Sequence, residues 1–354
     1  MTTILTTTGI SLFINTGRNY NTKEPTDDQM RQYLRMKPEA ASAEANSLLQ
    51  ITQTDDHLVF FRTETLEAER CANLLKEFFL SRGFKNVHIV ELQFQDDEKH
   101  IETHGLRNLV NALISEIEAA QRKGQQVVIN ATPGFKLESA YSTMIGMLYQ
   151  VPVKYIHEKF KRVVTFNPIA LVWDTSLFLT YDKFFLWLDA EPRRQQDIKK
   201  YLEGLADRES IEALLTPPDS DGYAFLSPMG EVLRRRFARE TEEAELVDWP
   251  PSAGVKDVED KIASSLLYRK HHPIKGSLSA CYKIAALDYV QEIIGGHFEN
   301  TPRSHIRRVD PDGTILLLWA DDQRAERLTI YTTARGRPQT IKVAEKIKEI
   351  LELK

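Results

Sequence analysis

Short apolar runs alternate with longer amphipathic segments in the first half of the chain. The runs are rich in β-branched and aromatic side chains and predict strands at residues 4–8, 57–61, 87–92, 127–131, 153–157 and 163–166. Apolar positions at helical spacing predict helices at residues 38–50, 66–82, 102–123 and 137–149, with a polar gap before the first of them. Strands that alternate with helices predict an α/β domain with a Rossmann-like, doubly wound parallel sheet.

Three polar loops follow expected strands, at residues 8–11, 62–65 and 132–136. In a parallel sheet such loops gather at the carboxyl ends of the strands, where ligands bind. The loop at 132–136 carries a glycine, a helix start and Lys136, which suit a phosphate, although an ordinary strand-to-helix turn has the same pattern. The chain lacks Gly-x-Gly-x-x-Gly after its first strand and lacks a P-loop, which argues against a dinucleotide enzyme or a P-loop ATPase.

The middle of the chain, residues 175–245, follows a pattern of short helices. Residues 177–188 are apolar and aromatic, as in a core or a dimer interface. Helices are expected at 192–202, 209–215 and 231–239, with a turn at 217–222 and a strand at 223–226. This order resembles a winged helix-turn-helix, a fold that binds DNA in some proteins and only dimerises in others. The arginines at 193–194 and 234–236 suit either phosphate contact or a solvated basic face.

The final segment switches from helical to alternating periodicity. Residues 246–256 form a linker that contains Pro250, Pro251 and Gly254. Helices are expected at 258–268 and at 278–294, where Gly295 and Gly296 end the second. Strands at 304–309, 314–319 and 327–332 and a helix at 339–353 follow, which together predict an α+β domain at residues 257–354.

Composition narrows the class of protein. With 354 residues, 42% of them apolar, and a net charge of -5, the chain is typical of a soluble globular protein of two or three domains. No run approaches the ~20 apolar residues of a membrane span, and the N-terminus lacks a signal-peptide pattern. Cys71 and Cys281 lie far apart in helical patterns, which argues against a disulfide framework or a cysteine metal site. These features favour a cytoplasmic protein without a membrane partner.

The segments Thr-Thr-Thr-Gly-Ile-Ser-Leu (6–12) and Asn-Ala-Thr-Pro-Gly-Phe-Lys (130–136) resemble the CRISPR-associated Rossmann-fold (CARF) sensor domain. Members of that family dimerise and bind a cyclic oligoadenylate across the two-fold axis, and a symmetric ligand suits an isologous dimer. The resemblance implies a homodimer activated by a cyclic oligoadenylate, most commonly cyclic tetra-adenylate, without a further cofactor or a metal. The implied ligand-binding residues are Gly9, Ile10, Ser11, Asn15, Arg62, Thr63, Glu64, Thr132, Pro133, Gly134, Phe135 and Lys136.

The final segment resembles RelE/ParE toxins, and RelE-type mRNA interferases in particular, in the order of its elements. Ten Lys and Arg against six Asp and Glu between residues 303 and 348 permit contact with RNA. Such enzymes need no metal, because they bring a ribose 2′-hydroxyl in line with its own phosphodiester while cations stabilise the developing charge. Ile315 and Ile341 stand where the family often has an arginine and a tyrosine. The implied catalytic residues are His305, Arg307, Arg308, Tyr331, Arg335, Arg337 and Lys342.

Two local expectations accompany this resemblance. Strand alternation predicts His305 and Arg307 on one face of their strand and Arg308 on the other. His271 and His272 lack further ligands, so we interpret them as a solvated helix end rather than a metal site.

A CARF-like sensor (1–172), a winged helix (175–245), a linker (246–256) and a RelE-like domain (257–354) together resemble the CRISPR-Cas-associated mRNA interferase family. The resemblance implies a cyclic-oligoadenylate-activated, metal-independent endoribonuclease that cuts mRNA on the bacterial ribosome and arrests translation in type III CRISPR defence. The alternative is a ligand-gated transcriptional regulator that binds DNA through the winged helix. A third possibility is that the sensor cleaves its own ligand, with Ser11 and Lys136 placed to help.

Overall fold

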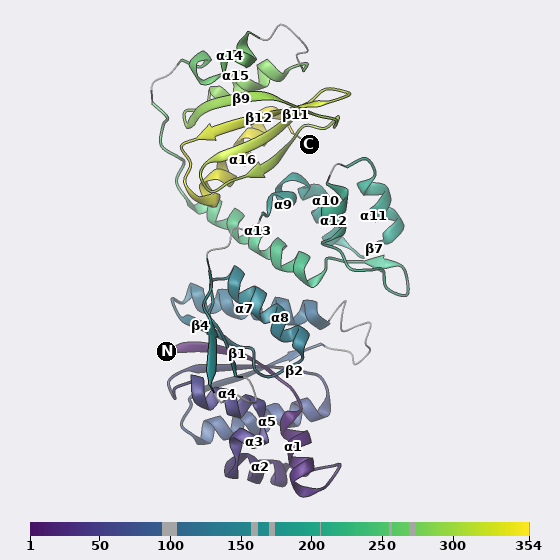
Figure 1. Ribbon diagram of the computed structural model, residues 1–354, viewed down its shortest axis with the longest axis vertical. Coiled ribbons are helices and arrows are strands. Elements are labelled where there is room, and N and C mark those ends of the chain that lie inside the picture. The colour runs from purple at the N-terminus through teal and green to yellow at the C-terminus, as the bar shows by residue number, and fades with distance from the viewer. Residues whose placement is uncertain are drawn as a thin grey trace. The chain divides into compact units, whose positions relative to one another are not determined.

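The computed structural model describes residues 1–93, 105–156, 162–169, 174–205, 207–254, 257–268 and 274–353 (Figure 1). Contacts divide the chain into two compact units. The first comprises Met1–Trp173 and Leu226–Val232, and the second comprises Asp174–Phe225 and Leu233–Lys354. The middle and final segments of the sequence therefore share one unit. Within the described ranges, no helix is long and apolar enough to cross a membrane. The expected helix end at His271 and His272 lies outside those ranges.

A six-stranded sheet forms the centre of the first unit. Its order is β3-β2-β1-β4-β5-β6, and all neighbours are parallel except β5 and β6. This confirms the expected α/β fold with a mostly parallel sheet. The antiparallel end follows from the short connection at residues 157–162, since a parallel crossover needs about a dozen residues or more. The strands are β1 (Thr2–Thr8), β2 (His57–Thr63), β3 (Asn86–Leu92), β4 (Gln126–Asn130), β5 (Val153–Ile156) and β6 (Val163–Phe166).

Helices cover both faces of this sheet. On one face, Leu5 and Val59 pack in a core with α7 (Leu106–Arg122) and α8 (Lys136–Leu148). On the other face, their neighbours Ile4 and Leu58 pack against the remaining helices, because successive strand residues point to opposite faces. Those helices are α1 (Ser11–Tyr20), α2 (Asp27–Met36), α3 (Pro38–Ala41), α4 (Ala43–Ile51) and α5 (Leu66–Ser81).

Two expectations for residues 12–50 were wrong. The polar gap contains α1 and α2, which were missed because α2 buries only Met30 and Leu34 in an otherwise polar sequence. A capping box between Thr26 and Gln29 starts α2 and marks it more clearly than its apolar content does. The helix expected at 38–50 is split into α3 and α4, because Ser42 has an extended backbone and caps α4 through the Ala45 N–H.

The second unit begins with short helices and a two-stranded pair. The helix expected from residue 192 starts later, because Arg193 and Arg194 pair with Ala224 and Tyr223. The long helix α13 (Pro228–Leu246) begins in the first unit and continues into the second. The other elements are α9 (Ser176–Thr180), α10 (Asp182–Ala190), β7 (Arg193–Arg194), α11 (Gln195–Leu202), α12 (Arg208–Glu212) and β8 (Tyr223–Ala224).

A four-stranded antiparallel sheet follows, with the order β10-β11-β12-β9. Ile293, Leu317 and Leu328 line the face that packs against α15 (Ser277–Ala285) and α16 (Gly336–Leu351). The strands are β9 (Val290–Glu299), β10 (His305–Val309), β11 (Thr314–Ala320) and β12 (Ala325–Thr332). An α+β arrangement was expected here, but with one strand fewer.

The strand that the sequence analysis did not predict is β9. The predicted helix at 278–294 was wrong, since α15 ends at Ala285 and β9 begins at Val290. Gly295 and Gly296 lie inside β9 rather than at a helix end. A Cβ at Gly295 would lie 2.5 Å from Leu266 Cδ2, so close packing against that side chain requires glycine. The helix expected at 258–268 is two short pieces, η2 (Glu259–Lys261) and α14 (Ser264–Leu267).

Candidate functional site

The first unit places two of the three predicted loops at its topological switch point. β1 lies between β2 and β4, and the order of the strands along the chain reverses there. Open α/β sheets bind ligands at the carboxyl ends of the strands that flank this point. The loop after β1 contains Gly9 and leads into α1, and the loop after β4 contains Gly134 and leads into α8. The Thr7 hydroxyl donates a hydrogen bond of 2.8 Å to the Pro133 carbonyl oxygen and joins the two loops.

Gly134 permits the close approach of these loops. Its φ is +93°, and a Cβ there would lie 2.2 Å from Glu138 Oε2 and 2.6 Å from Thr7 Oγ1. A side chain is therefore excluded both by backbone conformation and by space. The sequence pattern suggested that Gly134 lets the backbone approach a phosphate. In the structure Gly134 also allows close packing against Glu138 and Thr7.

Glu44, from the first turn of α4, holds the loop after β1. Its carboxylate is 1% exposed and accepts hydrogen bonds from the Gly9 N–H at 2.9 Å, the Ser11 hydroxyl at 2.8 Å and the Ser42 hydroxyl at 2.6 Å. Two residues predicted to face a ligand thus contact an internal anion. Sequence reasoning missed Glu44 because no motif connects it to a loop 35 residues away.

Glu138 is a second buried carboxyl group at the same end of the sheet. It lies in the first turn of α8 and accepts a hydrogen bond of 2.9 Å from the Phe135 N–H. Burial raises the pKa of Glu138 to about 7; the Phe135 N–H opposes this, and the negative charge of Glu44 adds to it. A carboxyl group that titrates near neutrality, beside a loop suited to phosphate, is a candidate functional group that the sequence did not reveal.

The tip of the loop after β4 is open to solvent. Gly134, Phe135 and Lys136 are exposed, and 65% of Phe135 is accessible. Ile10, at the start of α1, is also an exposed apolar side chain. An aromatic ring beside a lysine is suited to stack on a nucleobase while the ammonium group approaches a phosphate.

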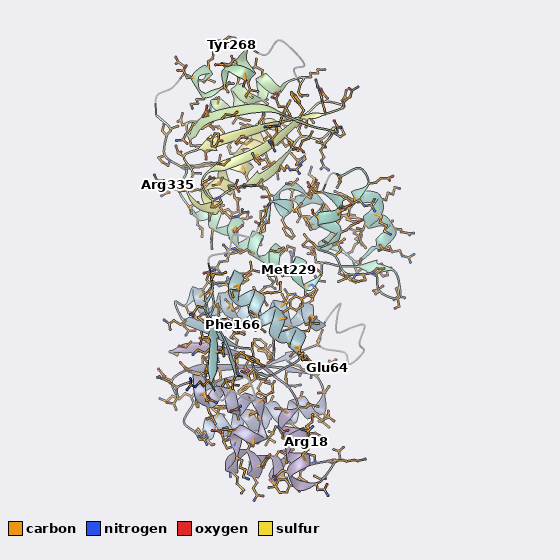
Figure 2. The ribbon with its side chains drawn as sticks, in the orientation of Figure 1. Arg18, Glu64, Phe166, Met229, Tyr268 and Arg335 are labelled. Carbon is orange, nitrogen blue, oxygen red and sulfur yellow. The ribbon has the colours of Figure 1, made fainter. Side chains whose placement is uncertain are left out.

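Most of the remaining predicted residues of this unit have internal partners. The Asn15 amide donates to the Ala41 carbonyl oxygen, and the Thr132 hydroxyl accepts from the Ile156 N–H. Arg62 forms an ion pair with Glu91 and donates to the Thr63 carbonyl oxygen. Glu64, labelled in Figure 2, is exposed in the loop after β2.

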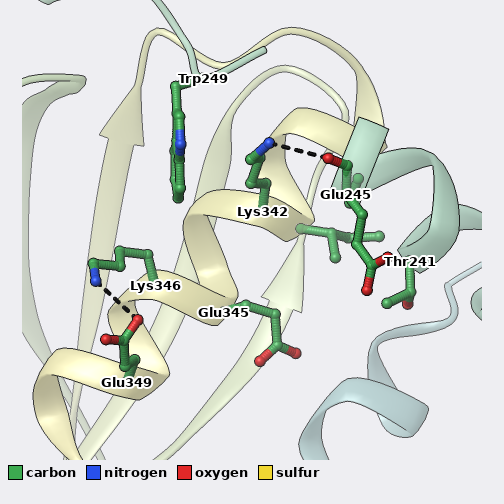
Figure 3. Close-up of a pocket in the computed structure, with 9 residues that line it drawn as sticks. Thr241, Glu245, Trp249, Lys342, Glu345, Lys346 and Glu349 are labelled. Atoms are coloured by element: carbon green, nitrogen blue, oxygen red, sulfur yellow. Dashed lines mark hydrogen bonds and ion pairs between the residues drawn. The ribbon is translucent and has the colours of Figure 1, made fainter. Parts of the chain in front are cut away.

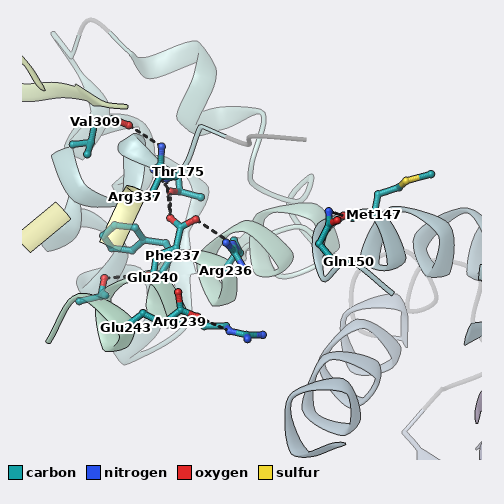
Figure 4. Close-up of polar contacts among 11 residues, drawn as sticks. Met147, Gln150, Thr175, Arg236, Phe237, Arg239, Glu240, Glu243, Val309 and Arg337 are labelled. Carbon is teal, nitrogen blue, oxygen red and sulfur yellow. Dashed lines mark hydrogen bonds and ion pairs between the residues drawn. The ribbon is translucent and has the colours of Figure 1, made fainter. Parts of the chain in front are cut away.

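In the second unit, two of the seven catalytic candidates are buried. Burial lowers the pKa of His305, whose ring packs near Tyr181 and whose Nδ1 lies 3.1 Å from the Arg303 carbonyl oxygen. Arg337 was expected to join Arg335 in a basic turn, but only 9% of it is accessible. Its guanidinium group binds Glu240, the Thr175 hydroxyl and the Val309 carbonyl oxygen (Figure 4). Neither side chain is on an open surface.

The alternation expected in β10 is interrupted by an irregularity between Ile306 and Arg308. His305 stands opposite Leu318 and Arg308 opposite Leu316, so these two residues share a face, and the expectation that Arg308 lies on the face opposite to His305 was wrong. Arg307 forms an ion pair with Glu299 at 2.8 Å, and Arg308 donates to both oxygens of Asp310.

Arg335 and Lys342 lie at the start of α16 and within it, not on a strand of the sheet. Arg335 is exposed and lines a hollow with Val247, Pro251 and Pro338 (Figure 2). The Lys342 ammonium group lies 5.0 Å from the centre of the Trp249 ring and donates to the Glu245 carbonyl oxygen (Figure 3). It also donates to the Val247 carbonyl oxygen, just beyond the end of α13. A cation at a helix C-terminus is stabilising, which gives Lys342 a structural role.

The face of the second sheet opposite α15 and α16 presents a different set of polar residues. Residues directly opposite one another on antiparallel strands point to the same face. Arg327 of β12 stands opposite His297 of β9, and Tyr331, four residues further along β12, stands opposite Glu292. His297, Glu292 and Tyr331 are exposed, and Arg327 is partly exposed. An imidazole, a guanidinium group and a phenol thus share one surface, which we call the open face.

Sequence reasoning missed His297 and Arg327 on the open face. His297 was not considered because β9 was interpreted as a helix ended by glycines. Arg327 was included in a predicted strand but was not paired with any histidine, because its partner strand was absent from the prediction. Of the seven predicted catalytic residues, Tyr331 lies on the open face, and strand pairing places Arg308 and the buried His305 on the same side of the sheet.

Several cations of the middle segment have acidic partners. In the short helix α12, Arg208 forms an ion pair with Glu212 at 2.8 Å. The basic stretch of α13 is also engaged, since Arg234 binds Asp189 and Arg236 binds Glu240. DNA affinity depends on cations that reach phosphates, and these ion pairs compete with such contacts.

Two comparisons extend these observations. Residues 39–169 match the model of a family described as CRISPR-associated protein (Cas_APE2256). This range covers the first unit from α3 to the end of β6. The first unit is therefore similar to a CRISPR-associated family from β2 to β6, which agrees with the association expected from the segment at 130–136; β1 and the loop after it lie outside the matched range.

Two solved structures are distant neighbours. Protein VC1899 from Vibrio cholerae aligns with a TM-score of 0.30 and 7% identity over 94% of this chain and 77% of its own. Can2 from Sulfobacillus thermosulfidooxidans, solved in complex with cyclic tetra-adenylate, aligns with a TM-score of 0.25 and 8% identity over 69% of this chain and 64% of its own. At these TM-scores neither likeness carries an argument about this chain.

Proposed function

We propose that this protein is a cyclic-oligoadenylate-activated endoribonuclease of type III CRISPR defence. The first unit would bind the ligand, and the second would cut mRNA on the ribosome. The observation that carries the ligand half is the pair of loops at the switch point, of which the loop after β4 lies in the range similar to a CRISPR-associated family. The observation that carries the nuclease half is the open face, with His297, Arg327 and Tyr331.

The ligand half rests on chemistry that suits a cyclic nucleotide. Lys136 supplies a positive charge at a helix start, and Phe135 supplies an exposed ring for an adenine. Cyclic tetra-adenylate is the expected ligand because it is the one most common in the family that these loops resemble. A homodimer would present the same loops to each half of the ring.

The nuclease half uses a reaction that needs no metal. The ribose 2′-hydroxyl loses its proton to a base and attacks the adjacent phosphorus, while the bond from phosphorus to the 5′-oxygen breaks. The 5′-oxygen takes up a proton, and the products are a 2′,3′-cyclic phosphate and a 5′-hydroxyl. His297 is the candidate for proton transfer, Arg327 for stabilising the phosphorane charge, and Tyr331 for contact with the RNA or for the second proton.

Translation in a cell-free bacterial extract tests this proposal, with and without cyclic tetra-adenylate. Wild type should arrest translation and cut mRNA in the ribosomal A site only when the ligand is present. Arg327→Gln should lower the cleavage rate by about 10²-fold, the typical effect of losing one charge-stabilising group. Lys283→Gln is the matched control, because Lys283 is an exposed cation on α15, across the sheet from the open face.

Two outcomes would contradict the proposal. Absence of arrest with cyclic oligoadenylates of any ring size would exclude the gated nuclease. Footprinting of a specific promoter would instead support the ligand-gated regulator, despite the engaged cations of the middle segment. Disappearance of the ligand during incubation would reveal that the sensor also cleaves it, and Ser11→Ala and Lys136→Ala would then test the residues responsible.

A further inference from the structure

Two buried carboxyl groups lie at the end of the first sheet that carries the ligand loops. Glu44 is 1% exposed and Glu138 is 6% exposed, and the negative charge of Glu44 acts on Glu138. Glu138 stands in the first turn of α8, immediately after the loop that contains Phe135. A ligand with phosphate groups therefore approaches a region that already holds two acidic side chains.

The two carboxyl groups differ in the hydrogen-bond donors around them. Glu44 accepts from one backbone N–H and two hydroxyl groups, at distances of 2.6–2.9 Å. These donors stabilise a negative charge, so an ionised Glu44 is compatible with burial. Among the described residues, Glu138 accepts a hydrogen bond only from the Phe135 N–H, at 2.9 Å. Because a buried carboxylate with one donor is poorly solvated, Glu138 is the group that favours its protonated form.

An ionised Glu138 would also compete with a phosphate for the start of α8. The first N–H groups of a helix and the positive end of its dipole attract anions. Gly134 packs directly against this carboxyl group, since a Cβ there would lie 2.2 Å from Glu138 Oε2. A phosphate bound at the loop would thus lie close to the carboxyl group and would be repelled by it in the absence of a proton.

The charges around Glu138 add to this repulsion. Within the described part of the chain, the one charged group that acts on Glu138 is Glu44 of α4, which is itself acidic. β4, β5 and α7 pack against α8 without bringing a charged side chain that acts on Glu138, and Lys136 is exposed to solvent. Burial raises the pKa of Glu138 to about 7, and the charge of Glu44 adds to the effect, in agreement with the pattern of donors.

We propose that Glu138 is a positioning residue that must carry a proton when the anionic ligand occupies the loops after β1 and β4. This proposal rests on the proposed function for the identity of the ligand. The protonated carboxyl group still accepts from the Phe135 N–H and so holds the loop without adding a charge beside the phosphate. As the pH rises through the pKa of Glu138, the proton must be taken from solvent on binding, and the ligand affinity falls.

Isothermal titration calorimetry of the full-length protein with cyclic tetra-adenylate tests the proposal. The phosphodiester groups of this ligand stay ionised at neutral and mildly alkaline pH, so they add no pH dependence of their own. One linked proton changes a dissociation constant by at most about tenfold per pH unit. The Kd of wild type should therefore rise by about tenfold between pH 6 and pH 8.5. Titrations in buffers of different ionisation enthalpy should show uptake of up to one proton at the upper pH.

Glu138→Gln separates the charge of this side chain from its shape. Glutamine keeps an oxygen for the Phe135 N–H and never ionises, so its Kd should be nearly the same at both pH values. At pH 8.5 it should bind the ligand about tenfold more tightly than wild type does. Glu39→Gln is the matched control, because Glu39 is an exposed carboxylate in the first turn of α3. This control should keep the pH dependence of wild type.

Three results would refute the proposal. The first is a wild-type Kd without pH dependence or without proton uptake, which decides the question even if the variant fails to fold. The second is the same pH dependence in folded Glu138→Gln as in wild type. The third is restoration of tight binding at pH 8.5 by Mg²⁺, because a metal ion rather than a proton would then neutralise the carboxyl group.

The same titrations separate this proposal from the proposed function. Absence of cyclic tetra-adenylate binding at every pH would exclude the ligand half of the proposed function and this role of Glu138 together. Binding with a Kd that is independent of pH would keep the ligand and exclude the role of Glu138. Proton-linked binding without cleavage of mRNA would keep the role of Glu138 and exclude the nuclease.

Discussion

Replacing Glu138 by glutamine should stabilise the first unit in a pH-dependent manner. The pKa of Glu138 is raised from 4.5 to about 7 by burial, so the folded protein holds this proton more tightly than the unfolded chain does. Stability from the protonated carboxyl group is fully present below the unfolded pKa and is lost as the pH rises through 7. Glutamine keeps an oxygen for the Phe135 N–H and never ionises, so the variant does not lose this stability.

The size of the effect follows from the two pKa values. A change from 4.5 to about 7 corresponds to ~3 kcal/mol above both values, an upper limit because the unit relaxes around a charge. In a unit of this size each kcal/mol moves Tm by about 2–4 °C. Glu138→Gln should therefore raise the Tm of the first unit by at most about 6–12 °C at pH 8 and leave it nearly unchanged at pH 4.5.

Differential scanning calorimetry of the full-length protein at several pH values measures this. Glu64→Gln is the matched control, because it removes an exposed carboxylate from a neighbouring loop of the same sheet. A Tm difference between Glu138→Gln and wild type that is the same at pH 4.5 and pH 8 would show that Glu138 does not titrate as described. So would a Glu64→Gln variant with the same pH-dependent gain.

Three other substitutions have defined outcomes. Gly134→Ala should destabilise the first unit by about 1–3 kcal/mol, because its positive φ and the contact with Glu138 both exclude a side chain; calorimetry would show no change if the loop relaxes freely. Phe135→Ala should weaken binding of cyclic tetra-adenylate by about 1–3 kcal/mol if the ring stacks on an adenine, and titration calorimetry at equal Tm measures this. Lys342→Met should destabilise the second unit by about 0.3–1 kcal/mol, because the ammonium group no longer interacts with the end of α13. Calorimetry should show a correspondingly lower Tm, while ligand-dependent cleavage stays unchanged.

The first sheet was predictable because its strands are buried on both faces. Runs such as 57–61 and 127–131 are apolar throughout, and this pattern is typical of central parallel strands. The second sheet was harder, because β9 is exposed on one side and contains two glycines. Its first residues, Val290 and Ile293, are three apart and fit helical spacing as well as a strand with an irregular register. The choice between them depends on β12, which lies more than thirty residues later.

The candidate site could be predicted only where a short sequence motif determines the local backbone geometry. A glycine and a lysine at a strand-to-helix turn are visible as a motif, and the structure brings that turn beside the loop after β1. Glu44 and Glu138 gain their significance from burial at a shared sheet edge, which no local pattern reveals. Arg337 shows the opposite error: its sequence neighbours suggested an exposed basic turn, whereas tertiary contacts with Glu240 and Thr175 bury it.

The contribution of α9 and α13 to the core of the second sheet has a consequence for how this protein can evolve. Leu179 and Ala244 lie in the same apolar cluster as Ile306 and Ile341, although they precede the linker in sequence. A gene fragment that begins after the linker would encode a sheet with an uncovered edge strand and an incomplete core, which favours aggregation. Recombination that transfers an intact second unit to another protein must therefore cut near Asp174 and carry the small helices along. Proteolysis within the linker would likewise nick the chain without releasing a separately folded domain.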